Sequence, residues 1–270
     1  MESEKKPLSS YWIRRIILDQ SKRANIGHIG SALSIADIMA SLYSNILNIF
    51  SPDDPDRDRF ILSKGHAALA LYAVLYLKGW ISREMLDTFC LDGTLLGVHP
   101  EHMIPGIDFS TGSLGMGLSF GAGAALAARL KRSSRRVFVL VSDGECNEGS
   151  LWEAAMFAAH HRLNNLIAIV DYNEQQALGY TKDVLNLSPL ACRWKSFGWN
   201  VREVNGHDIE QIVGAIYSFR TNNDCSPCVL IAHTICGKGV SYMERQIKWH
   251  YWPMSDEEYN IALIEIEKNI

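Results

Sequence analysis

The chain contains five short apolar runs, several of them rich in Val and Ile, with stretches of helical periodicity between them. Strands that alternate with helices predict a parallel sheet that helices cover on both faces. The strand candidates are 59–63, 136–142, 166–173, 199–205 and 228–234. The helical patterns are 66–79, 117–131, 151–163, 188–197 and 208–220. We therefore expect an α/β fold with a doubly wound, mostly parallel sheet, whose ligands bind at the carboxyl ends of the strands.

Further helical patterns flank this alternating region. Two of them, at 10–25 and 34–47, precede the first strand candidate, and a Gly- and Ser-rich segment at 27–34 predicts a loop between them. The segment 255–266 begins with Ser255, a favoured N-cap residue, followed by acidic residues in the first turn. We expect this last segment to form a helix.

The composition fits one globular unit. Of the 270 residues, 47% are hydrophobic, which is enough for one substantial core. No Pro-rich or Gly/Ser-rich linker and no internal repeat divides the sequence. We expect a single domain over residues 1–270, with residues 1–8 disordered.

The charge and the cysteines limit the partners and the compartment. The net charge of -4 gives no broad basic field, so we do not expect a nucleic acid partner. The first ten residues lack the apolar region of a signal peptide, and no apolar run is long enough to span a bilayer. We expect a cytoplasmic protein without a membrane partner, whose six cysteines are reduced thiols. Cys225 and Cys228 form a C-x-x-C pair, but a zinc site needs a second ligand pair.

Polar residues follow two of the predicted strands. An Asp-Gly pair closes the second strand candidate, and an Asn closes the third, thirty positions after the Asp. Asp143 offers the anionic oxygen that Mg²⁺ prefers, and Asn173 offers a neutral one. Gly144 leaves room for a phosphate, and the residues after it open a helix whose free N–H groups favour an anion. The pattern predicts a metal–diphosphate site; the alternative is an Asp in a helix cap and an Asn in a turn.

A glycine-rich turn at 111–117 leads into a helical pattern. The spacing of Gly115, Gly117 and Gly121 misses the dinucleotide-binding fingerprint by one residue. The turn also lacks a preceding Val-rich strand and an acidic residue about 20 positions later. The sequence therefore gives little support to a nicotinamide site.

Seven blocks, in order along nearly the whole chain, resemble the transketolase family, and specifically the separate N-terminal subunit of a split transketolase. They are 26–34, 54–75, 97–101, 105–130, the metal–diphosphate motif, 197–208 and 231–244. In the family this motif opens with Gly-Asp-Gly, whereas Ser142 replaces the first Gly here. The resemblance implies the thiamine diphosphate-binding fold, in its diphosphate-binding domain.

The resemblance also implies a cofactor and a metal. The cofactor is thiamine diphosphate, and the metal is Mg²⁺, for which Ca²⁺ or Mn²⁺ can substitute. The implied metal ligands are Asp143, Asn173 and the main-chain carbonyl of Gln175. The implied cofactor-binding residues are His66, Gly112, Leu114, Asp143, Gly144, Asn173, Ile235 and His250. Glu148 is implied in the subunit interface between two cofactor sites; alternatively it is a first-turn acid that the helix dipole stabilises.

Three histidines match catalytic positions of the family, namely His28, His99 and His250. An imidazole on a loop can reach a ligand and exchange protons near neutral pH. The alternative for any one of them is a histidine at a helix end that bonds to the backbone. Four histidines match no ligand position of the family, and we expect structural roles for them: His102, His160, His161 and His207. The role of His233 stays open.

The sequence departs from the family pattern at three places near the expected ligands. Met116 stands where the family usually has Gln, which removes an amide donor and acceptor. Tyr251 and Trp252 replace small residues beside His250. Either they displace the loop, or the aromatic rings narrow the entrance to the active site.

The resemblance implies transfer of a two-carbon ketol group from a ketose to an aldose. The activating Glu of the family belongs to a pyrimidine-binding domain, which we expect on a separate C-terminal subunit in an α2β2 heterotetramer. The substrates are expected to be sugar phosphates. Two alternatives stay open, an α subunit of a 2-oxo-acid dehydrogenase-type decarboxylase and a non-catalytic cofactor-binding module.

Overall fold

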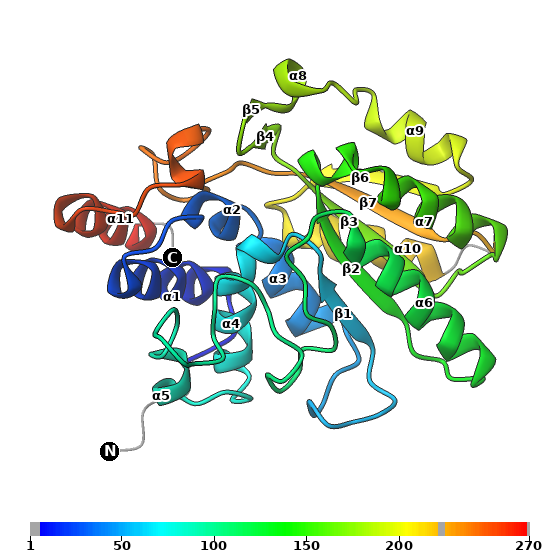
Figure 1. Ribbon diagram of the computed structural model, residues 1–270, viewed down its shortest axis with the longest axis horizontal. Helices are drawn as coiled ribbons and strands as arrows, with labels where there is room; N and C mark the ends of the chain where they lie inside the picture. The colour runs from blue at the N-terminus through cyan, green and yellow to red at the C-terminus, as the bar shows by residue number, and fades with distance from the viewer. Residues whose placement is uncertain (1–5, 221–224, 269–270) are drawn as a thin grey trace.

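A five-stranded parallel sheet forms the centre of the molecule (Figure 1). The computed structural model describes residues 6–220 and 225–268. The strands are β1 (Arg59–Leu62), β2 (Val137–Ser142), β3 (Leu166–Tyr172), β6 (Asn200–Asn205) and β7 (Cys228–His233). Their order in the sheet is β1-β2-β3-β7-β6, and all neighbouring pairs are parallel. All five predicted strands are confirmed, each within one residue, and so is the doubly wound α/β class.

The two faces of the sheet carry separate cores. In β2, Phe138 and Leu140 pack in one core, and the alternate valines pack in the other. The first core lies against α3 (Ala36–Ser41), α4 (Ala68–Leu77) and α10 (Ile209–Arg220). The second lies against α6 (Met116–Leu130), α7 (Gly149–His160) and α9 (Leu190–Ser196). Burial on both faces explains why β2, β3 and β7 read as continuous apolar runs, whereas the edge strand β6 is partly exposed.

The first and last predicted helices pack against each other beside the sheet (Figure 1). They are α1 (Ser10–Ala24) and α11 (Asp256–Glu267). Ser255 caps α11 as predicted, because its hydroxyl accepts from the Glu258 N–H at 3.1 Å. The Glu258 carboxylate accepts in return from the Ser255 N–H at 2.8 Å, which completes a capping box.

The segment predicted as a Gly/Ser-rich loop is instead a buried helix, α2 (Ile29–Ser34). Its Gly30 packs against the turn after β7, where an added Cβ would lie 2.7 Å from the Cys236 sulfur. Glycine therefore serves close packing here and does not mark a loop. The helix predicted at 34–47 is α3 followed by a π-helical turn, η1 (Leu42–Ile46).

Several short elements have no signal in the apolar pattern. They are α5 (Arg83–Leu86), α8 (Thr181–Val184), the antiparallel hairpin β4 (Gln175–Gln176) and β5 (Gly179–Tyr180), and the turns η2 (Gly65–Ala67), η3 (Gly144–Asn147) and η4 (Ile247–His250). Of the expected disordered stretch, residues 1–5 lie outside the described residues, whereas Leu8 packs against the core. Across 6–220 and 225–268, no helix has both the length and the apolarity to cross a membrane.

Candidate active site

The strand register brings the predicted metal–diphosphate residues to one edge of the sheet. Ser142 pairs with Asp171, and Tyr172 pairs with His233. The three central strands all end at this edge of the sheet, so Asp143, Asn173 and the turn after β7 lie side by side there. We call this edge the mouth of the site. The placement agrees with the rule that ligands bind at the carboxyl ends of parallel strands.

A buried ion pair lies at the centre of this mouth. The side chains of Lys64 and Asp171 are both 0% exposed, and the Lys64 ammonium donates to the Asp171 carboxylate. Burial raises the pKa of Asp171, but the charge and hydrogen bonds of its neighbours outweigh burial and hold this pKa below its ordinary value. Asp171 is therefore an anion that the surrounding residues fully engage.

Three further side chains bond to the Asp171 carboxylate. The Ser34 hydroxyl, from α2, donates at 2.6 Å, and the Thr234 hydroxyl donates from the turn after β7. The Asn173 amide donates at 2.9 Å, which fixes its nitrogen toward Asp171. The amide oxygen of Asn173 then faces the Gln175 N–H at 2.9 Å. One carboxylate thus sets the orientation of a predicted metal ligand.

Asp143 is buried, with 4% of its surface exposed. It accepts from the Gly144 N–H at 2.7 Å and from the Glu174 N–H at 2.6 Å. Burial, and then the negative charge of Asp171, raise the pKa of Asp143 to about 7. A divalent cation beside this carboxylate would offset both effects.

The donor set fits a hard cation that is shared with a ligand. Asp143 supplies one carboxylate, and Asn173 and Gln175 supply neutral oxygens, which suits Mg²⁺, Ca²⁺ or Mn²⁺. Within the described residues, no group of three or more His, Cys, Asp or Glu side chains is arranged to hold a metal alone. The missing oxygens would have to come from a bound anion such as a diphosphate.

Gly144, directly after Asp143, packs closely against Gln176 of the hairpin that follows β3. A Cβ on Gly144 would lie 2.9 Å from the Cβ of Gln176, so this position has no room for a side chain. The residues that follow form the 3-10 turn η3, and α7 begins only at Gly149. The predicted helix start directly after Gly144 is therefore corrected. Glu148 is the exposed N-cap residue of α7 and makes no side-chain capping bond.

A second buried carboxylate, missed by the sequence analysis, holds the glycine-rich turn beside the site. Glu145 is 0% exposed and accepts from the Ser63 hydroxyl and, at 2.7 Å, from the Gly115 N–H. Its partners span β1 and the turn before α6, so Gly112 and Leu114 lie near the mouth. No strand lies in residues 63–115, all of which the structure describes, so the turn lacks the strand–turn–helix context of a dinucleotide site.

Histidines from four separate segments gather at the mouth. The ring centroids of His28 and His66 are 5.5 Å apart, and those of His66 and His250 are 6.5 Å apart. The exposed His99 packs its ring against Gly112, where an added Cβ would lie 3.1 Å away. The structure thus brings together all four histidines that the resemblance selected.

Three of these histidines are neutral at neutral pH. Burial, and then the charge of Lys64, lower the pKa of His250 to about 4 and that of His66 well below its ordinary value. Burial, with smaller contributions from His99 and Lys64, also lowers the pKa of His28. The Nδ1 atoms of His28 and His250 are buried without a hydrogen-bond partner in the described part of the chain. Each imidazole can therefore offer a nitrogen to a polar ligand.

The two aromatic residues beside His250 do not displace its loop from the cluster. Tyr251 is 54% exposed and donates from its hydroxyl to the Ala177 carbonyl at 2.6 Å. Trp252 is 62% exposed on the same surface. Met116, the third departure from the family pattern, is 40% exposed at the start of α6.

The fold and the mouth define a diphosphate-binding α/β protein, and comparison with known proteins identifies its family. Residues 6–266 match the family described as transketolase, thiamine diphosphate binding domain. The chain belongs to the transketolase family.

Two relatives, both named as transketolase subunits, match this chain over nearly their whole length. This chain is 42% identical to a subunit of the apulose-4-phosphate transketolase of Phocaeicola vulgatus, over 100% of this chain and 96% of the relative. It is 40% identical to the 6-deoxy-6-sulfo-D-fructose transketolase subunit SqwG of a Clostridium species, over 95% of this chain and 94% of the relative. A solved transketolase from Campylobacter jejuni matches with a TM-score of 0.89 at 30% identity, over 96% of this chain and 42% of that chain. These findings confirm an N-terminal, thiamine diphosphate-dependent transketolase subunit.

We predict that Lys64→Met destabilises the protein by about 3–5 kcal/mol, because it leaves the buried Asp171 without its cation. The measurement is urea-induced unfolding of the variant and the wild type. Lys248→Met is the control, since Lys248 pairs with Glu258 on the surface and its loss is worth about 1 kcal/mol or less. Equal stability of the two variants would contradict a central role for the buried pair.

Proposed function

We propose that this chain supplies the diphosphate and metal half of a thiamine diphosphate site, and that a separate C-terminal subunit supplies the pyrimidine half. The assembled enzyme transfers a two-carbon ketol group from a ketose to an aldose. One observation carries the proposal: oxygen donors for a cation and neutral histidines with unpartnered nitrogens share one mouth of the sheet. In this proposal the whole chain, 1–270, is one cofactor-binding domain.

The metal is Mg²⁺, with Ca²⁺ or Mn²⁺ able to replace it. Asp143, Asn173 and the main-chain carbonyl of Gln175 hold it together with the diphosphate. The cofactor further contacts His66, Gly112, Leu114, Gly144, Ile235 and His250. When bound, thiamine diphosphate supplies the nucleophilic carbon that ketol transfer needs. The protein binds and orients both molecules.

His28, His99 and His250 act on the hydroxyl groups of the two sugars. The lowered pKa values of His28 and His250 keep these rings neutral, so each can both accept and donate a proton near neutral pH. Their unpartnered Nδ1 atoms are free for such bonds in the described chain. Transfer breaks the C2–C3 bond of the ketose, releases an aldose two carbons shorter, and joins the ketol group to the aldehyde carbon of the acceptor.

Two observations support a separate partner subunit. The relatives are named as subunits, and the chain spans 42% of a solved transketolase. We propose an α2β2 heterotetramer in the cytoplasm, with Glu148 between two cofactor sites. Glu148 is exposed at the N-terminus of α7, which supports a position in a subunit interface. The net charge of -4 supports neither nucleic acid nor an acidic membrane as a partner.

The substrates are proposed to be sugar phosphates. The relatives' names specify apulose-4-phosphate and 6-deoxy-6-sulfo-D-fructose, which both carry an anionic group. Tyr251 and Trp252 lie exposed beside His250, and flat rings there can narrow the entrance or pack against the face of a sugar.

The first prediction concerns the partner. The purified chain alone, with thiamine diphosphate and Mg²⁺, is expected to transfer no ketol group between a ketose phosphate and an aldose phosphate. Addition of the C-terminal subunit restores transfer, because that subunit completes the cofactor site. Appreciable transfer by the lone chain in a product assay would contradict the two-subunit site.

The second prediction concerns the metal ligand. Asp143→Ala weakens Mg²⁺-dependent binding of thiamine diphosphate by about 100-fold or more, since a close opposite charge is worth several kcal/mol in a partly buried site. Titration calorimetry on the assembled enzyme measures the affinity. Asp53→Ala, which removes an exposed carboxylate before β1, serves as the control. Normal affinity of the Asp143→Ala enzyme would exclude Asp143 as the metal ligand.

The third prediction separates catalysis from folding. His28→Asn and His99→Ala lower turnover by about 100-fold or more, as expected for lost proton transfer, while the melting temperature changes little. Asn is chosen at position 28 because His28 has a positive φ of 60°, which Asn tolerates. His102→Ala, on the same exposed loop as His99, is the control. If a variant has normal turnover at saturating substrate, the residue that was replaced is not catalytic.

A further inference from the structure

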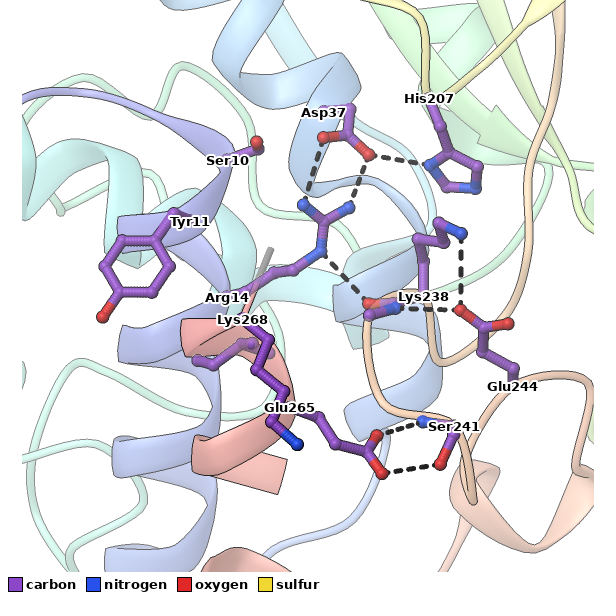
Figure 2. A pocket seen from close by; sticks show the side chains of 12 residues that line it. Ser10, Tyr11, Arg14, Asp37, His207, Lys238, Ser241, Glu244, Glu265 and Lys268 are labelled. Atoms are coloured by element: carbon purple, nitrogen blue, oxygen red, sulfur yellow. Dashed lines mark hydrogen bonds and ion pairs between the residues drawn. The ribbon is translucent and has the colours of Figure 1, made fainter. Parts of the chain in front are cut away.

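Three buried charged or polar side chains form a network behind the turn that follows β7 (Figure 2). Arg14, Asp37 and His207 come from α1, α3 and the loop before α10, and their side chains are 11%, 8% and 12% exposed. They line a pocket of about 580 Å³ that shares no residue with the histidine cluster. The sequence predicted a structural role for His207, and no motif pointed to Arg14 or Asp37.

His207 is held in one tautomer by its two contacts. Its Nε2 atom accepts from the Ile235 N–H at 2.9 Å, so this nitrogen carries a lone pair. Its Nδ1 atom lies 2.7 Å from the Asp37 carboxylate and therefore carries the proton that it donates. The ring is thus a neutral bridge between Asp37 and the backbone of Ile235.

Arg14 bonds to the C-terminal end of the same turn, at Lys238. Its Nε atom donates to the Lys238 carbonyl at 3.1 Å. Its two terminal nitrogens donate to the two oxygens of Asp37, at 3.1 and 2.5 Å. Figure 2 shows Asp37 between the two side chains, so one carboxylate joins the contacts at both ends of the turn. Burial opposes the charge of Asp37, but the bonds from His207 and Arg14 outweigh it and lower its pKa to about 2.

The other side of this turn faces the active-site mouth. Thr234 donates to the buried Asp171 carboxylate, and the Gly237 N–H donates to the Gly30 carbonyl at 2.9 Å. Gly30 belongs to α2, whose N-cap residue is His28. The turn is therefore packed between the histidine-bearing helix and the Arg14–Asp37–His207 network.

We propose that Arg14, Asp37 and His207 are positioning residues for thiamine diphosphate, because they fix the backbone of the turn Ile235–Lys238 that contacts it. This inference rests on the proposed function, in which Ile235 is a cofactor contact. His207 acts through the Ile235 N–H, and Arg14 acts through the Lys238 carbonyl. None of the three touches the reacting atoms.

The pocket itself does not carry a ligand proposal. Lys238 lies 3.4 Å from Glu244, and both the hydroxyl and the N–H of Ser241 donate to Glu265. With Arg14 and Asp37 also paired, most of the charged side chains in the wall have a partner (Figure 2). The network is complete without a bound ion.

Two substitutions at His207 separate its two contacts. In His207→Gln the amide oxygen reaches the place of Nε2 and can still accept from Ile235, while the contact with Asp37 is lost. In His207→Asn the shorter amide can still donate to Asp37, while the contact with Ile235 is lost. His233→Gln is the matched control, because His233 is an exposed histidine at the end of β7 that pairs with Glu203.

The measurements are the Kd for thiamine diphosphate with Mg²⁺ in the assembled enzyme and the melting temperature of each variant chain. We expect His207→Asn to raise the Kd about tenfold, the upper range for one net hydrogen bond. His207→Gln and His233→Gln should stay within about threefold of the wild type. An unchanged Kd for His207→Asn, or equal losses for the Asn and Gln variants, would overturn the proposal.

Two further variants keep the test decisive. If His207→Asn does not fold, Arg14→Lys tests the other end, since Lys keeps a charge near Asp37 but lacks the Nε donor to Lys238. Weaker cofactor binding is expected, and unchanged binding would overturn the proposal. Asp143→Ala distinguishes the two hypotheses. If it too binds normally, the proposed cofactor site is wrong; if it alone loses binding, only the positioning role is wrong.

Discussion

The buried pair of Lys64 and Asp171 is the interaction on which the site depends. Removing two charges from water costs several kcal/mol each, and a buried pair recovers this cost only when its hydrogen bonds are complete. Asp171 meets the condition, because Lys64, Ser34, Thr234 and Asn173 all donate to it. These partners belong to the end of β1, to α2, to the turn after β7 and to the end of β3. One carboxylate therefore ties together four of the segments that border the mouth.

The electrostatics of the mouth follow from the same pair. Lys64 adds to burial in lowering the pKa values of the nearby imidazoles, and Asp171 adds to burial in raising the pKa of Asp143. The mouth thus presents neutral histidines beside a carboxylate that a cation would stabilise. Such a surface would suit the metal–diphosphate that we propose for this site.

The sequence predicted the sheet well because its Val- and Ile-rich runs are local signals, and the strand ends then placed Asp143 and Asn173 at one edge. It misjudged α2, whose Gly30 makes a close contact with Cys236, far away in the chain. It gave no role to Lys64, Asp171 or Glu145, since the hydrogen-bond partners that stabilise a buried charge can lie up to 137 residues away in the chain. The histidines of the site came from the family resemblance and not from spacing, and His207 seemed structural because its contact with Ile235 exists only in the fold.

We propose that this chain holds the metal and the diphosphate and that another subunit holds the pyrimidine. Anomalous diffraction from crystals of the assembled enzyme with thiamine diphosphate and Mn²⁺ would locate both groups. We expect a manganese peak bonded to Asp143, Asn173 and the carbonyl of Gln175, with the pyrimidine ring against the partner subunit. A manganese peak away from these residues, or a cofactor enclosed by this chain alone, would contradict it.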